Sequence, residues 1–222
     1  VVVGAGPVGL VAALLLAKQG ISVLLIEKER SIFPLPRAAH IDHEIMRIFQ
    51  SIGVADEVAS SSEVSTRYEF LNVSGDVLMR FDTGRAAALS GWPPSNMIHQ
   101  PSIEHVLRAR VAESDSIDTR YGTAYRYHET CGEVVTVHFD TQGKASQACC
   151  GFLLGCDGAN SAVRTNAGLS MVDLGFSERW LVIDTRVIDS SRLPRHNLQI
   201  CDPERPTTSV RMGAGRHRWE FM

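Results

Sequence analysis

Glycines at three fixed positions near the amino terminus could bring backbone amides against a phosphate group. Gly4, Gly6 and Gly9 form a GxGxxG pattern within the segment GAGPVG, where Pro7 follows the second glycine. Gly4 would permit a tight turn, Gly6 would leave room for a pyrophosphate, and Gly9 would let a helix pack closely on a sheet. Free amides at the start of that helix, which carry about half a positive charge, would hold the phosphates. The spacing therefore predicts a dinucleotide site.

An acidic residue follows at the distance that such a site requires. Glu27 ends an apolar stretch 18 residues past Gly9, where dinucleotide-binding units place the carboxylate that accepts hydrogen bonds from the adenosine ribose. A carboxylate there also disfavours a 2′-phosphate. Lys28 follows it directly. The remaining interpretation is an ordinary glycine turn in an α/β protein.

The elements that would position these residues form a βαβ unit. Val1–Val3 is β-branched and predicts a strand, and Leu10–Gln19 is rich in Ala and Leu and predicts a helix that Gly20 ends. Ile21–Ile26 predicts a second strand, which delivers the carboxylate. Because the chain opens directly on a strand without an initiating Met, we expect further residues to precede it.

A second cluster of polar residues follows another short apolar stretch, Phe152–Cys156. Asp157 and Gly158 form a turn there, and Ser161 and Arg164 follow shortly after it. An Asp in this place can cap the backbone N–H groups of a helix that starts after it. The residues alone allow two interpretations, a purely structural corner and a part of the ligand site.

Together the two motifs resemble the signatures of the single-component flavoprotein monooxygenases, the FAD-dependent aromatic hydroxylases related to para-hydroxybenzoate hydroxylase. In that family a DGxxSxxR segment serves FAD and the pyridine nucleotide together. The resemblance covers the whole chain in order and extends to the 3-(3-hydroxyphenyl)propionate hydroxylase-like branch, although polyketide and resorcinol hydroxylases share much of the pattern. The segments that carry the branch resemblance are RAAHID (Arg37–Asp42), HQPSIE (His99–Glu104), WLVID (Trp180–Asp184), CDPERP (Cys201–Pro206) and RWEF (Arg218–Phe221).

The resemblance assigns roles to single residues. Arg37 is similar to the arginine that reaches the FAD, and Gln100 to the side chain that contacts the ribityl region at a helix start. The backbone near Tyr125 is similar to the adenine contact, and Arg164 would brace its corner of the chain rather than touch substrate. The cofactor-binding residues predicted in this way are Gly4, Gly6, Pro7, Gly9, Glu27, Lys28, Arg37, Gln100, Tyr125, Asp157, Gly158 and Arg164.

The same resemblance implies a reaction. NADH or NADPH would reduce FAD, O₂ would form a flavin C4a-hydroperoxide, and a phenolic substrate like 3-(3-hydroxyphenyl)propionate would attack its distal oxygen. The protein would exclude water and hold the ring carbon near that oxygen. The alternatives are a same-fold flavoprotein of another reaction class (polyketide hydroxylase, epoxidase, reductase or halogenase), a non-catalytic FAD-binding fragment, and a plain NAD dehydrogenase.

No residue can be assigned as the catalytic group that ionises the phenol. His40, His43 and His99 are candidates only because imidazole titrates near neutrality. We expect His40 and His43 on one face of a helix from His40 to Phe49, where they could share a metal, but the sequence offers no third ligand. We therefore predict no metal site.

The rest of the chain predicts further helices and strands. Ser102 would cap a helix that runs to about Glu113. Arg67–Phe81 alternates around Asn72–Asp76 and predicts a β-hairpin, and the loop Thr83–Ser95 follows it. Further predicted strands are Thr119–His128, Val134–Asp140, Ala145–Cys150, Trp180–Val187 and Val210–Met222.

The order of these elements predicts an α/β protein, α+β overall. We expect a Rossmann-like FAD-binding domain, with a parallel sheet and a β-meander, interleaved with a β-sheet-rich substrate domain. Residues 1–66 and 96–170 would form the FAD-binding domain, and residues 67–95 and 171–222 a truncated part of the substrate domain. Because we find no Gly-Asp flavin motif of the family, we expect the chain to be an N-terminal portion of a longer protein.

Composition limits the other classes of function. The chain of 222 residues is 44% hydrophobic and 21% charged, and its net charge of −3 gives no basic surface for nucleic acid or an acidic membrane. Its longest apolar run, Val8–Ala17, is too short to span a bilayer. The five cysteines are odd in number and form no CxxC pair, which argues against a disulfide framework and favours the cytoplasm. We expect a small-molecule substrate and O₂ as partners, and leave a homo-oligomer open.

Overall fold

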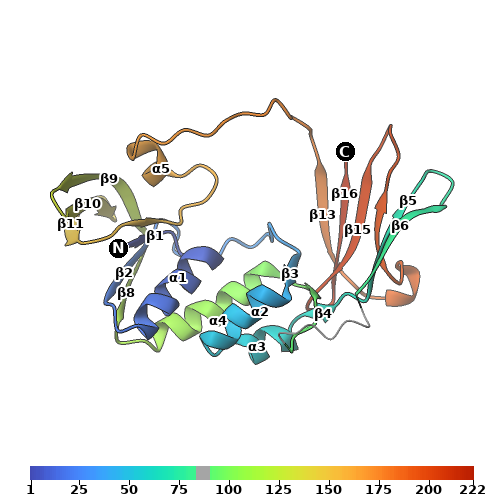
Figure 1. The fold of residues 1–222 in the computed structure, drawn as a ribbon, viewed down its shortest axis with the longest axis horizontal. Coiled ribbons are helices and arrows are strands. Elements are labelled where there is room, and N and C mark those ends of the chain that lie inside the picture. Colours follow the sequence, from blue (N-terminus) through green and yellow to red (C-terminus); the bar gives the residue numbers. More distant parts are fainter. Residues whose placement is uncertain (84–90) are drawn as a thin grey trace. The chain divides into compact units, whose positions relative to one another are not determined.

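A computed structural model describes residues 1–83 and 91–222. The chain forms two compact units, and each unit combines two separate stretches of sequence (Figure 1). Unit 1 consists of Val1–Phe33 and Glu104–Leu174, and unit 2 of Pro34–Ile103 and Gly175–Met222. The chain therefore passes from unit 1 to unit 2 and back again before it ends in unit 2.

A four-stranded parallel sheet forms the centre of unit 1. Helix α1 (Pro7–Lys18) connects its strands β1 and β2 and buries Leu10, Ala13 and Leu14. The predicted βαβ unit is thus confirmed, with a helix that starts at the proline because the first turn needs no amide there. The strands of the sheet, in spatial order, are β12 (Leu154–Gly155), β1 (Val2–Val3), β2 (Val23–Glu27) and β8 (Ile117–Tyr121).

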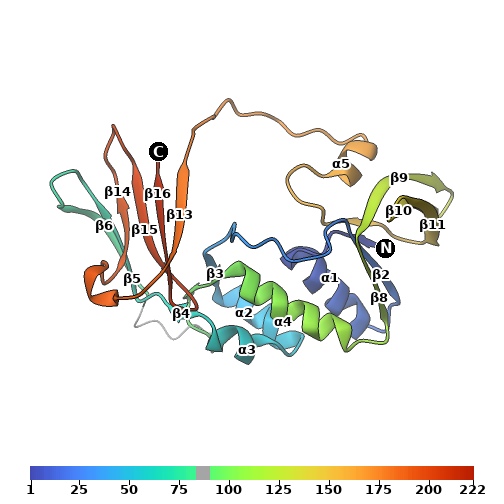
Figure 2. The ribbon, with the colours of Figure 1, turned by 180° about the vertical axis from the view of Figure 1, so that it is seen from behind.

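An antiparallel meander covers one face of this sheet, and Figures 1 and 2 show α1 and α4 (Gln100–Ala112) on the other. Val3 and Ile26 from the sheet pack against Val137 and Phe139 from the meander. All four side chains are buried, and burial of each contributes about 1.5–3 kcal/mol. The elements on the meander side are β9 (Thr123–Cys131), β10 (Val134–Thr141), β11 (Lys144–Cys150) and the short helix α5 (Ala162–Asn166).

The prediction of one strand over Thr119–His128 is wrong, because the chain turns at Gly122. Gly122 has a positive φ of 68°, a conformation that glycine adopts readily. A Cβ there would also press on the Arg30 side chain. The turn separates β8, in the parallel sheet, from β9, in the meander, so one run of strand-forming residues serves two sheets.

Unit 2 is built on a six-stranded sheet. Neighbouring strands are antiparallel except for β14 and β5, which are parallel. The predicted hairpin is present as β5 and β6. The strands, in spatial order, are β13 (Leu181–Arg186), β16 (Arg216–Phe221), β15 (Thr207–Met212), β14 (Asn197–Ile200), β5 (Arg67–Leu71) and β6 (Val77–Asp82). Smaller elements of unit 2 are β3 (His40–Asp42), β4 (Glu63–Val64), β7 (Ser95–Met97), α2 (His43–Ser51), α3 (Ala55–Ser60) and the 3-10 helix η1 (Ser190–Arg192).

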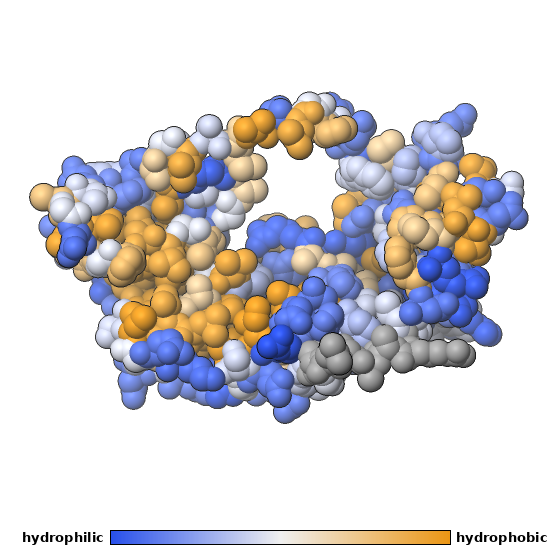
Figure 3. All heavy atoms as spheres, viewed as in Figure 1, coloured by the Kyte–Doolittle hydropathy of each residue, from blue (hydrophilic) through white to orange (hydrophobic). Residues whose placement is uncertain are grey.

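Apolar side chains reach the surface along both edge strands of this sheet (Figure 3). Leu78 on β6 and Leu181 on β13 are each 61% exposed. An edge strand also presents unpaired backbone groups. Among the described residues, both edge strands therefore carry exposed apolar side chains.

The helix predicted from His40 starts three residues later than expected. It begins at His43 as α2, because the Asp42 carboxylate caps it and accepts a hydrogen bond of 3.0 Å from the Ile45 amide. His40–Asp42 forms β3 instead. The prediction that His40 and His43 share a helical face is therefore wrong.

The helix predicted from Ser102 also starts elsewhere. It begins at Gln100 as α4, so Ser102 lies inside the first turn and is not the cap. Pro101 is compatible with this earlier start, because the first turn of a helix tolerates a residue without an amide hydrogen. The Ser102 hydroxyl pairs with His99 Nδ1 at 2.8 Å.

The predicted strand Val210–Met222 is in fact a hairpin. β15 ends at Met212 and β16 begins at Arg216, and the turn between them places Ala214 and Gly215 at positive φ values of 59° and 66°. The predicted loop Thr83–Ser95 lies largely outside the described residues, and its last residue begins β7.

Both kinds of sheet predicted from the sequence are present. Unit 1 holds a parallel sheet with a meander, and unit 2 holds a larger, mainly antiparallel sheet. These findings confirm the predicted α/β fold class. In the described ranges, no helix has the length and apolar character that a membrane crossing needs.

Candidate functional site

The two sequence motifs of unit 1 lie side by side at the carboxyl ends of parallel strands (Figure 1). β1 leads into the glycine loop (Gly4–Gly9), β2 ends at Glu27, and β12 leads toward Asp157. Val3 pairs with both Ile26 and Gly155, so the three strands end at the same level. Open α/β sheets bind their ligands at this edge.

The three glycines of the loop serve different purposes. Gly4 has a φ of 101°, and a Cβ there would collide with the Cys156 carbonyl oxygen. A Cβ at Gly9 would collide with the Gly4 carbonyl oxygen, because the first turn of α1 lies directly on the loop. A Cβ at Gly6 would meet nothing within 4 Å. Gly4 and Gly9 are therefore needed for packing inside the protein, whereas Gly6 borders open space.

Helix α1 presents its amino terminus beside that space. Gly6 is the N-cap in an extended conformation, with φ of −75° and ψ of −179°, and Pro7 opens the helix. Among the described residues, no side chain caps this helix, and no acidic residue occupies its first turn. The amides of that turn and the partial positive charge of the helix end therefore fit an anion such as a phosphate.

The Glu27 carboxylate binds the backbone on two sides. Its Oε2 accepts a hydrogen bond of 2.7 Å from the Ala5 amide in the glycine loop, and its Oε1 accepts one of 2.9 Å from the Glu29 amide. A carboxylate offers about four lone-pair sites, so Glu27 can still accept the hydroxyl groups of a ribose. Lys28 beside it is exposed. The sequence did not predict the bond to Ala5, which makes Glu27 a support of the loop as well.

Asp157 organises the corner between β12 and α5. Its Oδ1 accepts a hydrogen bond of 2.5 Å from the Ser161 hydroxyl, and its Oδ2 accepts bonds from the amides of Ala162 (2.7 Å) and Val163 (3.2 Å). Gly158 follows with a φ of 85°, a value that suits glycine in a sharp turn. Ser161 is the N-cap residue of α5, and the Asp157 side chain caps the two amides that follow it, so it shapes the corner.

Arg164 braces the same corner. Its Nη1 donates a hydrogen bond of 2.8 Å to the Ala159 carbonyl oxygen, and its amide donates one of 2.9 Å to the Ser161 hydroxyl. The Cys156 carbonyl packs so closely on Gly4 that no Cβ fits between them. The corner and the glycine loop are thus in direct contact.

Tyr125 fastens the meander to α5. Its hydroxyl forms hydrogen bonds with Asn166 Oδ1 at 2.9 Å and with His128 Nδ1 at 2.7 Å. The His128 amide donates a hydrogen bond of 2.8 Å to the same Asn166 oxygen. Burial raises the pKa of Tyr125, and the charge of Asp157 raises it further, so the hydroxyl stays protonated. Neither His128 nor Asn166 belongs to a recognisable spacing, so the sequence did not predict their part in this contact.

Arg37 and Gln100 lie together in unit 2. The buried Gln100 accepts hydrogen bonds through Oε1 from the amides of Arg37 (3.0 Å) and Ala38 (2.8 Å). Gln100 thus holds the loop that carries Arg37, a contact that the sequence did not predict. The other predicted cofactor-binding residues all belong to unit 1.

The three histidines named as candidates for proton transfer lie in separate polar pairs. Burial lowers the pKa of His40, so its ring is neutral at physiological pH. Throughout residues 1–83 and 91–222, no group of His, Cys, Asp or Glu is placed to hold a metal ion. The partners are Ser95 for His40 (2.9 Å), Glu44 for His43 (3.5 Å) and Ser102 for His99 (2.8 Å).

A serine–histidine pair in the six-stranded sheet resembles part of a hydrolase relay, but it is inaccessible. Ser209 Oγ lies 2.9 Å from His217 Nε2, and both residues are 0% exposed. His217 Nδ1 is buried and has no hydrogen-bond partner in the described part of the chain, so no carboxylate orients the ring. Burial, and then the charge of Arg211, lower the pKa of His217. We interpret this pair as part of the interior of the sheet.

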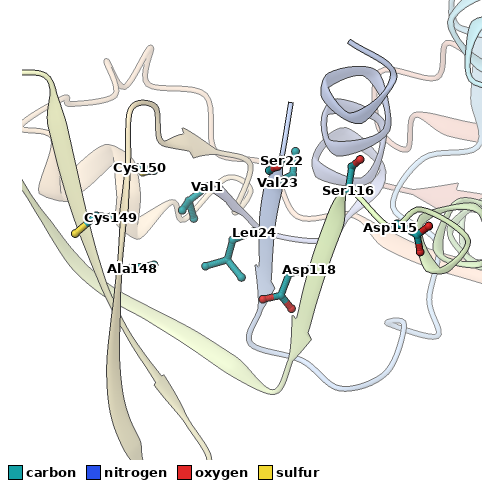
Figure 4. A pocket seen from close by; sticks show the side chains of 10 residues that line it. All are labelled: Val1, Ser22, Val23, Leu24, Asp115, Ser116, Asp118, Ala148, Cys149 and Cys150. Carbon is teal, nitrogen blue, oxygen red and sulfur yellow. The ribbon is translucent and has the colours of Figure 1, made fainter. Parts of the chain in front are cut away.

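A cavity in unit 1 opens at the opposite ends of the parallel strands (Figure 4). It measures about 330 Å³ and is lined by Val1, Ser22 and Ser116, which precede β1, β2 and β8, and by Cys149 and Cys150 of β11. The glycine loop contributes no residue to its lining. This cavity is therefore separate from the site at the carboxyl edge.

A family profile described as "FAD binding domain" matches residues 1–217. The chain belongs to this FAD-binding domain family. FAD, the cofactor predicted from the sequence, is thereby confirmed as the cofactor of the family.

Curated relatives match this FAD-binding chain along its whole length. It is 37% identical over 226 residues to a probable NADH-specific resorcinol 4-hydroxylase of Rhodococcus jostii (strain RHA1), a match that covers 99% of this chain and 42% of the relative. It is 33% identical over 223 residues to a 3-(3-hydroxy-phenyl)propionate/3-hydroxycinnamic acid hydroxylase of Mycobacterium sp. (strain JLS), which covers 100% of this chain and 38% of the relative. The chain thus spans about two fifths of these relatives, and the resemblance inferred from the sequence is confirmed.

Solved structures share the fold of this FAD-binding chain. The p-nitrophenol 4-monooxygenase PnpA from Pseudomonas putida DLL-E4 matches with a TM-score of 0.90 and 22% identity, over 99% of this chain and 56% of that chain. Aklavinone-11 hydroxylase, in a ternary complex with FAD and aklavinone, matches with a TM-score of 0.81 and 24% identity, over 99% of this chain and 44% of that chain. At these identities the likeness establishes the fold.

The residues at the carboxyl edge of unit 1 fit such a cofactor. A dinucleotide needs an approach to the backbone, donors for its pyrophosphate and an acceptor for its ribose. The open space beside Gly6, the uncapped start of α1 and the lone pairs that Glu27 retains provide these three features.

Proposed function

We propose that the whole protein is an FAD-dependent aromatic monooxygenase, which hydroxylates a phenolic substrate with NADH or NADPH and O₂. The observation that carries the proposal is the glycine loop, where Gly6 borders open space at the start of α1 and Glu27 ends the neighbouring strand. The names of the relatives support the reaction class, because they are hydroxylases of resorcinol and of 3-(3-hydroxy-phenyl)propionate. We favour a phenolic acid like the second compound as substrate.

The residues of this chain would bind and orient the cofactor. The amides of the glycine loop would hold the pyrophosphate, since an uncapped helix end favours an anion. Glu27 would accept the ribose hydroxyls while its bond to Ala5 keeps the loop in place. The residues proposed to hold or shape the cofactor site are Gly4, Gly6, Pro7, Gly9, Glu27, Lys28, Arg37, Gln100, the backbone near Tyr125, Asp157, Gly158 and Arg164.

Bound FAD supplies the redox chemistry, in which electrons pass from NADH or NADPH to O₂ and one oxygen atom enters the aromatic ring. The amides at the start of α1 offset the charge of the pyrophosphate without any proton transfer. The cap that Asp157 provides keeps the corner beside the loop in one conformation. These contacts bind and orient, and we assign proton transfer from the phenol to no described residue.

We extend the proposal to the organisation and the cellular location of the protein. Residues 1–66 and 96–170 would form the FAD-binding domain, and residues 67–95 and 171–222 would belong to the substrate domain. The five cysteines are all free, which suits the reducing cytoplasm.

Purification of the full-length protein tests the proposal. We expect the protein to carry a flavin with visible absorbance and to oxidise NADH or NADPH faster when a phenolic acid is added. Mass spectrometry should then detect the hydroxylated product. A colourless protein that FAD cannot reconstitute contradicts the proposal. A flavoprotein that no phenol stimulates belongs to another reaction class.

The Gly6→Asp variant tests the placement of the cofactor. Its carboxylate would stand in the open space where the phosphates are proposed to bind, so we expect loss of the flavin. The apo protein should keep its stability, because the new side chain meets nothing nearby. Normal flavin retention in Gly6→Asp contradicts this placement.

A further inference from the structure

The loop that carries Arg37 has no helix or strand of its own between Pro34 and Ala39. Its backbone groups therefore depend on other elements for hydrogen bonds. Two side chains of unit 2 provide them. They are Gln100 at the start of α4, which is 6% exposed, and Arg218 on β16, which is 4% exposed.

The two peptide groups that flank Arg37 are each held at both ends. In the group between Pro36 and Arg37, the carbonyl oxygen accepts a hydrogen bond from Arg218 Nη2, and the amide donates to Gln100 Oε1 at 3.0 Å. In the group between Arg37 and Ala38, the carbonyl oxygen accepts from Arg218 Nη1 at 3.5 Å, and the amide donates to Gln100 Oε1 at 2.8 Å. Because a peptide group is planar, these four bonds fix both backbone dihedrals of Arg37.

Arg218 is itself fixed by a carboxylate on the neighbouring strand. Its Nε and Nη2 donate to the two oxygens of Asp184 at 2.7 and 2.9 Å, the two-point geometry of strong arginine–carboxylate pairs. Glu220 lies farther away, with 3.6 Å between Nη1 and its Oε1. The hydrogen bonds to Asp184 raise the pKa of Arg218 against the opposing effect of burial, so the guanidinium stays charged.

We propose that Arg218, held by Asp184, is a positioning residue for FAD binding. It sets the backbone of Arg37 and so supports the part in FAD binding that the proposed function gives to Arg37, on which this inference rests. A guanidinium suits this role because its planar fork of donors can face a carboxylate and two carbonyl oxygens at once. A lysine ammonium keeps the charge but cannot span these acceptors. The effect of Arg218 on FAD then passes entirely through Arg37.

A double-mutant cycle on the full-length apo protein tests this inference. The quenching of FAD fluorescence gives the affinity of the wild type, Arg218→Lys, Arg37→Ala and the double variant. We expect each single variant to bind FAD about tenfold more weakly, which equals about 1.4 kcal/mol. The double variant should bind no more weakly than Arg37→Ala alone. The matched control is Arg216→Lys. Arg216 lies on the same strand, and its Nη1 donates a hydrogen bond of 3.3 Å to the Ala214 carbonyl oxygen in its own hairpin turn. The Arg216→Lys variant should bind FAD with the affinity of the wild type.

The outcomes separate the inference from a general effect on the fold. Additive losses in the double variant overturn it, because Arg218 then acts independently of Arg37. An unchanged affinity in either single variant overturns it as well. If Arg218→Lys does not fold, Asp184→Asn replaces it in the cycle, since this change loosens the guanidinium without removing it. A wild-type protein that binds no FAD refutes the proposed function, whereas wild-type binding with additive losses refutes only this inference.

Discussion

At the scale of single residues, the glycines of the loop differ in whether their surroundings leave room for a Cβ atom. A methyl group at Gly9 would collide with the Gly4 carbonyl oxygen, whereas one at Gly6 would enter open space. We predict that Gly9→Ala lowers the free energy of unfolding by about 1–3 kcal/mol, the usual effect of overpacking. Gly6→Ala should change it by less than about 0.5 kcal/mol. Urea denaturation of the apo protein measures both, and equal losses would contradict the distinction.

His217 makes the stability of the fold depend on pH. Burial, and then the charge of Arg211, hold its pKa below the ordinary value of 6.5. Below pH 6.5 the unfolded chain binds a proton that the folded ring does not accept. Stability therefore falls as the pH drops from 6.5 toward the lowered pKa, and it is unaffected by this group above 6.5.

We predict that His217→Gln flattens this pH dependence. Glutamine keeps a polar partner for the Ser209 hydroxyl but does not titrate. Urea unfolding at about pH 7.5 and about pH 5.5 gives the free energy of unfolding that each protein loses on acidification. The wild type should lose more than His217→Gln, by at most about 1.4 kcal/mol per pH unit, the limit for one proton. If both proteins lose the same stability on acidification, another group is responsible.

The sequence located the site residues whose spacing reflects a local turn, and it missed contacts that tertiary folding creates. Gly4, Gly6 and Gly9 could be assigned because one tight turn requires all three. The contact of Gln100 with Arg37 joins residues 63 positions apart, and that of Arg218 joins residues 181 positions apart. No periodicity in the sequence reports on such pairs.

At the scale of elements, composition predicted where strands form but not where they turn into another sheet. The run around Gly122 reads as one strand because strand-forming residues continue on both sides of the turn. The run from Val210 to Met222 hides a hairpin for the same reason, since its turn contains Gly213–Gly215 between similar residues. The positive φ values at Gly122, Ala214 and Gly215 and the pairing of the strands reveal the breaks.

The corner between β12 and α5 yields a prediction for one element. Asp157→Ala removes the acceptor for the Ser161 hydroxyl and for the two amides that open α5. We expect a loss of about 0.5–2 kcal/mol, the usual effect of removing a helix cap. Hydrogen exchange should be faster at residues 162–166, which form α5, while exchange in α1 stays unchanged. Asp115→Ala, in the exposed turn after α4, is the matched control, and similar changes in both variants would contradict the role of the cap.

At the scale of the whole molecule, each unit depends on strands that are distant in sequence. β2 pairs with β8 in unit 1, which joins Val23–Glu27 to Ile117–Tyr121. β5 pairs with β14 in unit 2, which joins Arg67–Leu71 to Asn197–Ile200. The βαβ start predicted a parallel sheet because helix and strand alternate there, but the spatial order of the strands is set by these distant pairings. The fold class could therefore be predicted, and the strand order could not.

Ligand linkage gives a prediction for the whole protein. FAD that binds the folded but not the unfolded chain should stabilise it by about 2.7 kcal/mol at 100 times its Kd, and by about 4.1 kcal/mol at 1,000 times. Thermal unfolding of the full-length apo protein should show a Tm that rises with the FAD concentration. Gly6→Asp should show no rise, because its carboxylate fills the space that we assign to the pyrophosphate, whereas Arg216→Lys should follow the wild type. A Tm in Gly6→Asp that rises as steeply as in the wild type would place the cofactor away from the glycine loop.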